Sequence, residues 1–63
     1  MNNYAVFIDD KFVLDIIAET DDKARDQMRH MLRLMKCDDI RVCVDGVSCF
    51  ANGKYCRFEI AKQ

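Results

Sequence analysis

One histidine and four cysteines are the residues of this chain best suited to nucleophilic or metal chemistry. The cysteines, Cys37, Cys43, Cys49 and Cys56, follow at intervals of six, six and seven residues, without the close Cys-x-x-Cys pairs of structural zinc sites. His30 stands on the predicted helix, away from the cysteines, whereas a catalytic thiol needs an adjacent base. The sequence therefore predicts no catalytic residue, no metal site, no cofactor and no enzymatic activity.

Basic residues recur at helical spacing in the middle of the chain. Arg25, Arg29, Arg33 and Lys36 fall on one side of the predicted helix, and cations at this spacing can follow phosphate groups. Acids in the first helical turn and bases in the last turns also complement the helix dipole, which gives the row a structural explanation. A nucleic-acid or nucleotide contact through these residues, together with aromatic residues of the predicted sheet, is the alternative function.

Two aromatic and two basic residues fall on the solvent face of the predicted C-terminal sheet. Alternation along the strands places Arg41, Phe50 and Tyr55 in one cross-strand row and Arg57 in the next. Exposed rings beside arginines are typical of protein-interface anchors, and single-stranded nucleic acid also stacks on such rings. We predict that these four residues bind a protein partner.

Length and composition limit the class of protein. The chain has 63 residues, 51% hydrophobic and 33% charged, which predicts one domain over residues 1–63. Its formal net charge is −1, so a contact with nucleic acid needs a local basic patch. No apolar run approaches the roughly 20 residues that span a membrane, and no secretory signal is recognisable. We expect a cytoplasmic protein with reduced thiols and no membrane partner.

Periodicity predicts the elements that position these residues. Residues 1–19 contain two β-rich runs around the polar residues 9–11, which indicates a hairpin. Thr20 is the expected N-cap of a helix over residues 20–37. Residues 40–62 alternate strictly and contain two hairpin-turn dipeptides, Asp45-Gly46 and Asn52-Gly53, which predict a three-stranded meander. The apolar stripe of the helix consists of Ala24, Met28, Met31, Leu32 and Met35.

This order predicts a two-layer α+β fold, ββαβββ, with one amphipathic helix packed on a five-stranded, mostly antiparallel sheet. The two turns predict that Val44 pairs with Val47 and that Cys49 pairs with Cys56. Three strand orders remain open. They are 2-1-3-4-5 and 2-1-5-4-3, both fully antiparallel, and an arrangement with a parallel third strand after a right-handed crossover.

Both faces of the first predicted hairpin are apolar, although a single helix can cover only one of them. Simple alternation puts one set on one side, namely Ala5, Phe7, Phe12, Leu14 and Ile16. The opposite side carries Val6, Ile8, Val13 and Ile17. An uncovered apolar patch usually marks a protein interface. We therefore expect a homodimer or a tightly held partner, with an oligomer interface made by Phe7, Phe12, Leu14 and Ile16.

Acidic residues cluster in two predicted loops, Asp9-Asp10 and Asp38-Asp39. The topology places both loops at the same end of the domain. Three interpretations remain open: solvated loop residues, an acidic patch for a basic partner, and a weak divalent-cation site.

The segment Ala18-Glu19-Thr20-Asp21-Asp22, followed by Ala24, resembles the opening half of HicB-like antitoxin domains over about half of this chain. The Asp-Gly and Asn-Gly turns depart from that pattern, so no site residue is carried over. The short chain with excess apolar surface is also similar in kind to phage-encoded anti-CRISPR proteins. The resemblance implies a small binding protein that acts by stoichiometric occupancy of a larger protein or its ligand, as a phage or mobile-element inhibitor of host defence.

Overall fold

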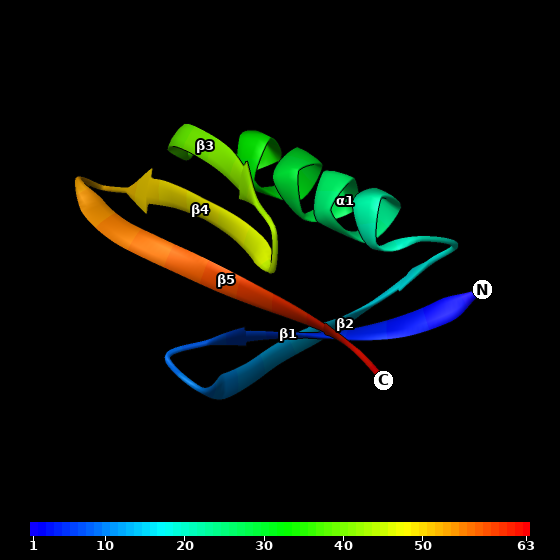
Figure 1. Ribbon diagram of the computed structural model, residues 1–63. Helices are drawn as coiled ribbons and strands as arrows, with labels where there is room; N and C mark the ends of the chain where they lie inside the picture. The colour runs from blue at the N-terminus through cyan, green and yellow to red at the C-terminus, as the bar shows by residue number, and fades with distance from the viewer.

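Six elements follow one another in the computed structural model, which describes residues 1–63. They are β1 (Asn2–Ile8), β2 (Lys11–Ala18), α1 (Asp21–Leu34), β3 (Asp38–Cys43), β4 (Gly46–Ala51) and β5 (Lys54–Lys62). The strands form one antiparallel sheet in the order β2-β1-β5-β4-β3, and α1 lies on one of its faces (Figure 1). The predicted α+β fold, ββαβββ, is confirmed, and one of the open strand orders is selected.

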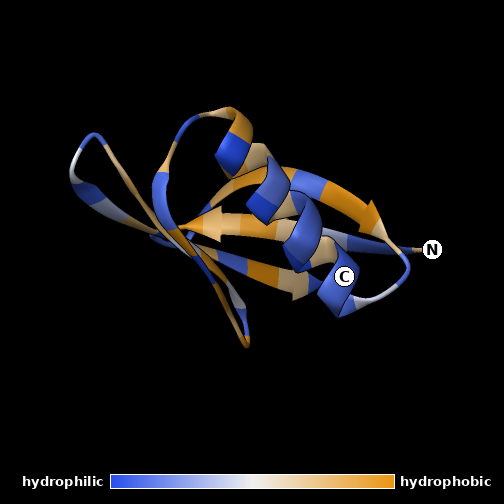
Figure 2. Ribbon diagram, turned by 90° about the horizontal axis from the view of Figure 1, so that it is seen from above, coloured by the Kyte–Doolittle hydropathy of each residue, from blue (hydrophilic) through white to orange (hydrophobic).

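The core lies between α1 and the sheet. Both edge strands, β2 and β3, contact the helix, so the sheet curls around it, and the side of the helix away from the sheet is mostly hydrophilic (Figure 2). Met35, which was expected in the apolar stripe, is exposed beyond the end of the helix. The buried cluster consists of Tyr4, Val6, Ile16, Ala18, Ala24, Met28, Leu32, Val47 and Cys49.

The N-terminal end of α1 is fixed by two side-chain hydrogen bonds. The Lys23 amide donates to the Thr20 hydroxyl at 3.2 Å, which confirms Thr20 as the N-cap. The buried Tyr4 hydroxyl donates to Asp21 Oδ1 at 2.8 Å. This second bond ties the first strand to the first turn of the helix.

The C-terminal end of α1 is a Schellman motif. The Lys36 amide donates to the Arg33 carbonyl and the Cys37 amide to the Leu32 carbonyl, both at 3.0 Å. Lys36 has a φ of 61°, a left-handed conformation that glycine adopts without strain. The helix therefore ends at Leu34, earlier than predicted, and Cys37 packs against the core.

A β-bulge divides the first hairpin. Val6 pairs with Leu14 and Phe7 pairs with Phe12, so Val13 is an extra residue without a partner. An extra residue reverses the alternation of side chains along one strand. As a result, the even-numbered residues of β2 face one side of the sheet before the bulge and the other side after it.

The predicted grouping of the first hairpin was therefore wrong. Ile16 is buried in the core and Leu14 packs against it, so these two residues face the helix and not an oligomer interface. Phe7 and Phe12 face away from α1. Each of the two predicted sets therefore contains both buried and exposed residues. The large apolar residues exposed along β2 are Phe12, Val13 and Ile17.

The tight turn of the β3–β4 hairpin lies one residue earlier than predicted. Cys43 pairs with Gly46, whereas the sequence predicted that Val44 pairs with Val47. A Cβ atom on Gly46 would lie 1.9 Å from the Phe58 carbonyl oxygen. Glycine is thus required here because the β5 backbone passes close by, and Val44 is left exposed at the turn.

The other two hairpins close with type I′ turns, in which both central residues have positive φ. These are Asp9 and Asp10, at 50° and 64°, and Asn52 and Gly53, at 54° and 77°. The Asn52-Gly53 turn and the Cys49–Cys56 pairing that it sets are as predicted. A second irregularity interrupts β3 around Asp39, whose φ is 51°.

Replacing Lys36 with glycine should raise the free energy of unfolding by about 1 kcal/mol, because the left-handed conformation is strained for any residue with a Cβ atom. Urea unfolding followed by circular dichroism measures the change. Lys36→Ala is the control and should bring no such gain. A Lys36→Gly protein less stable than the parent would contradict the role given to this residue.

The Tyr4–Asp21 contact predicts a pH dependence. Burial, and then the hydrogen bond to Asp21, raise the pKa of Tyr4 above its ordinary value of 10.0. Its contribution to stability is therefore complete below about pH 10 and is lost as the pH rises through the folded-state pKa. The unfolding free energy should fall less between pH 9 and 11 in Tyr4→Phe than in the parent or in Tyr55→Phe. Equal slopes in all three proteins would refute this assignment.

Candidate functional site

The sheet face opposite α1, called the outer face below, carries the four residues predicted to bind a partner. Phe50 and Tyr55 lie directly opposite each other beside the β4–β5 turn. Their ring centroids are 5.5 Å apart at an interplanar angle of 64°, an edge-to-face contact. Both rings remain solvent-accessible, at 37% and 55% exposure. The pair is a rigid apolar group in water.

Arg41 and Arg57 share one cross-strand row. Each pairs with Ser48, one from β3 and the other from β5. The prediction that Arg41 lies in the row of the two aromatic residues was wrong, because the earlier β3–β4 turn shifts the register by two residues. The shift preserves the side-chain alternation, so all four predicted residues still share the outer face.

Each of the two arginines forms an ion pair with an aspartate of this chain. Arg57 Nη2 donates to Asp45 Oδ1 at 2.5 Å, and this hydrogen bond, with the charge of Asp45, raises the pKa of Arg57. Arg41 Nε donates to Asp39 Oδ1 at 3.2 Å. The two guanidinium groups therefore carry little uncompensated charge toward a partner.

A second aromatic pair lies on the same face. Phe7 and Phe12 have ring centroids 6.1 Å apart at 75°. Phe7 pairs with Glu59 of β5, whose side chain shares the outer face with Arg57 and Tyr55 because residues two apart on a strand point the same way. These two phenylalanines are the part of the predicted oligomer interface that faces solvent.

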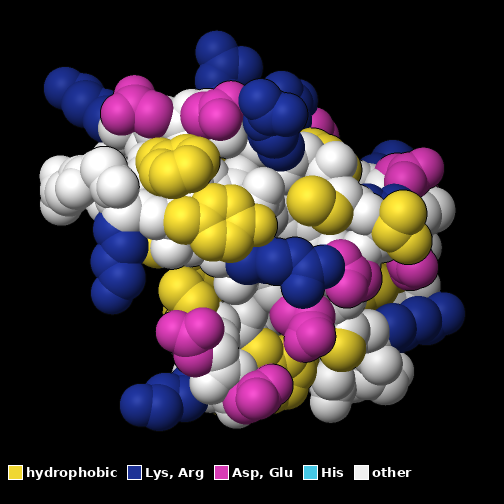
Figure 3. Space-filling model, turned by 60° about the vertical axis from the view of Figure 1, so that its left-hand side comes forward, with side chains coloured by type: hydrophobic (Ala, Val, Ile, Leu, Met, Phe, Trp, Pro, Cys, Tyr) yellow, Lys and Arg dark blue, Asp and Glu magenta, His cyan; other side chains and the backbone are white.

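A hollow of about 210 Å³ lies between the first hairpin turn and β5. It is lined by Phe7, Asp9, Asp10, Arg57 and Glu59. None of its three carboxylates takes part in an ion pair. Seen from the side of the hairpin turns, a compact hydrophobic group borders basic and acidic side chains, with further acidic groups beyond (Figure 3).

The basic stripe of α1 is only partly free. Arg25 Nη1 donates to the Val44 carbonyl at 2.9 Å, which links the helix to the β3–β4 turn, and Arg25 also pairs with Asp22. Arg29 pairs with Asp26 at 2.7 Å. Arg33 and Lys36 form no ion pair. Two of the four predicted phosphate-binding residues thus hold acids of the helix itself.

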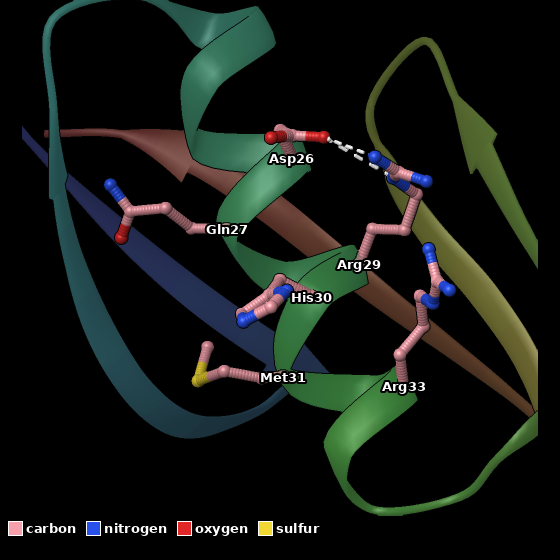
Figure 4. A pocket seen from close by; sticks show the side chains of 6 residues that line it. All are labelled: Asp26, Gln27, Arg29, His30, Met31 and Arg33. Atoms are coloured by element: carbon pink, nitrogen blue, oxygen red, sulfur yellow. Dashed lines mark hydrogen bonds and ion pairs between the residues drawn. The ribbon is translucent and has the colours of Figure 1, made fainter.

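The larger hollow, of about 370 Å³, lies along α1. Its six lining residues all belong to the helix. Figure 4 shows that their side chains leave the helix in different directions. Asp26, Arg29 and Arg33 point to one side, and His30 points to the other. The cations therefore do not converge on one ligand position. The remaining lining residues are Gln27, whose amide donates to the Ile17 carbonyl at 2.9 Å, and Met31.

The cysteines are spread over both faces of the sheet. Cys49 is buried, with Cys56 opposite it and Cys37 as a neighbour, whereas Cys43 lies on the outer face beside Ser48. Burial raises the pKa of the Cys49 thiol to about 11, and the hydrogen bond with Cys37 adds to the shift. No group of three His, Cys, Asp or Glu residues is placed to hold a metal ion.

Sequence reasoning did not single out Glu59 as a binding residue, and it missed that the carboxylates of the first turn lie beside it. The sequence indicated this arrangement only in part. Asp9-Asp10 was recognised as a turn, but its position beside β5 follows from the pairing of β1 with β5, which the sequence left open among three strand orders.

Comparison of the chain with protein-family models, curated proteins and solved structures finds no match. The helix α1, of 14 residues, is too short and too polar to cross a bilayer, and no other helix is present.

The thiol of Cys49 should react at least about tenfold more slowly with iodoacetamide at pH 8 than it does in urea-unfolded protein, since thiolate is the reactive form and burial suppresses it. Peptide mapping by mass spectrometry after brief native labelling measures each cysteine separately. Labelling of native Cys49 at the unfolded rate would contradict its burial.

Proposed function

We propose that this chain is a non-enzymatic binding protein whose outer face occupies a surface of a larger protein. The observation that carries the proposal is the Phe50–Tyr55 pair, two large rings fixed against each other and left in water. Tyrosine, other aromatic residues and arginine are enriched among the residues that contribute most to protein interfaces. The proposal rests on this composition and on the fact that no element of the chain covers the outer face.

The position of the rings on two paired strands favours tight binding. Both side chains belong to a type I′ hairpin and are held by contact with each other. Little conformational entropy is then lost when a partner covers them. Arg41 and Arg57, paired with Asp39 and Asp45, provide hydrogen-bond donors near the rings.

The mechanism that we propose is steric. A small domain that covers a functional surface of its partner blocks that surface at one-to-one stoichiometry. Inhibition of a host defence protein, as in the phage-encoded proteins that this chain resembles in kind, is the specific form that we propose. The outer face is also open to a second copy of the chain, so the experiment below includes light scattering.

The alternative, a nucleic-acid or nucleotide contact through the basic stripe of α1 and the aromatic residues of the sheet, has less support. Arg25 and Arg29 are paired with Asp22 and Asp26, which leaves Arg33 and Lys36 as the unpaired cations of the stripe. Neutralised arginines release few counterions on binding phosphate.

The test is a reconstituted complex. A protein captured by the tagged chain from host lysate is purified, and the dissociation constant is measured by calorimetry, with light scattering to give the stoichiometry. Phe50→Ala with Tyr55→Ala should weaken binding at least about tenfold, as expected for interface anchors. The matched control, Leu34→Ala with Met35→Ala, removes two apolar side chains at the end of the helix that are more exposed than the two rings, and binding should stay within about threefold of the parent.

Circular dichroism confirms that both double variants are folded. If the aromatic variant binds as the parent does, or if the helix variant alone loses binding, the outer face is not the contact surface.

A further inference from the structure

We infer that the outer face takes a basic partner: an extended protein segment that presents a lysine or arginine side chain between two apolar ones. This inference rests on the proposed function and specifies the chemistry of the partner. It follows from which charges of the outer face are free and from how far apart its apolar groups lie.

The free charges of the outer face are negative. Arg41 and Arg57, which by composition alone favour an acidic partner, are paired with Asp39 and Asp45. The carboxylates of Asp9, Asp10 and Glu59 line the hollow without a cationic partner among the ion pairs of the chain. A positive side chain entering the hollow meets three carboxylates and one guanidinium that is already neutralised. Electrostatic complementarity therefore selects a cation.

The lining of the hollow also suits the organic cations of proteins. Phe7 contributes an aromatic ring beside the three carboxylates, and an ammonium or guanidinium group is attracted to such a ring. The alkyl stem of lysine or arginine would at the same time cover part of the ring. A bare metal ion gains neither contact, and no group of residues here is arranged to hold one.

The two aromatic pairs set the spacing of the apolar contacts. Tyr55, of one pair, is separated along β5 by four residues from Glu59, which lies opposite Phe7 of the other pair. At about 3.3 Å per residue this separation is about 13 Å. An extended partner segment has the same spacing between its residues i and i+4, and its residue i+2 points the same way. A Leu-Xaa-Lys-Xaa-Leu segment thus matches both pairs and the hollow between them.

The probes are three blocked pentapeptides, Leu-Ser-Lys-Ser-Leu and its counterparts with norleucine or glutamate in place of lysine. Each is titrated into the whole 15N-labelled protein to about 10 mM, a range that detects millimolar affinity. The lysine peptide should shift the amides of Phe7, Arg57 and Glu59. It should bind at least about fivefold more tightly than the norleucine peptide, the difference made by a partly desolvated charge pair. The glutamate peptide should bind most weakly.

A charge-neutral variant locates the effect. Asp10→Asn with Glu59→Gln removes two carboxylates of the hollow, and asparagine tolerates the positive φ at position 10. The variant should lose the preference for lysine over norleucine. The control, Glu19→Gln with Asp26→Asn, makes the same two chemical changes on the helix side and should keep the preference. Retention of the preference in the first variant overturns the inference, as do equal affinities of the three peptides or the absence of shifts.

The two proposals fail in different ways. If the captured partner depends on Phe50 and Tyr55 but is insensitive to Asp10→Asn with Glu59→Gln, the outer face binds protein and only the charge of the partner is wrong. If the aromatic variant binds the partner as the parent does, the proposed function fails, whatever the peptides do.

Discussion

One helix has to supply the entire second layer of this fold, and its fully buried stripe consists of Ala24, Met28 and Leu32. A stripe of this width covers one face of a five-stranded sheet only if the sheet curls, and both edge strands do reach the helix. The other face then has nothing in the chain to cover it. Its four aromatic residues form two edge-to-face pairs, which lowers the apolar area that each ring exposes. The accessible aromatic surface is thus a consequence of the size of the domain.

Local chemistry made most of the fold predictable. The N-cap at Thr20, the type I′ turn at Asn52 and Gly53, and the alternation that follows it each depend on residues close in sequence. These signals were sufficient for the element order and for the Cys49–Cys56 pairing. The mispredicted β3–β4 turn, by contrast, depends on distant residues. Gly46 looked like a turn residue because the approach of the Phe58 carbonyl is invisible in the sequence.

The candidate site was predictable in its membership more than in its electrostatics. Alternation placed Phe50, Tyr55 and Arg57 on one face. Arg41 stays on that face because shifting a register by two residues preserves the face. The state of the arginine charges could not be read in this way. Asp45 reaches Arg57 because the β3–β4 turn closes one residue early, and that turn is set by tertiary contact. The two arginines alone would indicate an acidic ligand. Because both are paired, the charges of this face that remain free are negative.

The interruptions of the two border strands, at Val13 in β2 and around Asp39 in β3, have a consequence for concentrated protein. A regular border strand offers an unbroken row of amides and carbonyls on which another molecule can add its own strand, and such additions lead to fibrils. Here each row is broken and locally twisted. Such interruptions hinder the addition of further strands at either edge of the sheet.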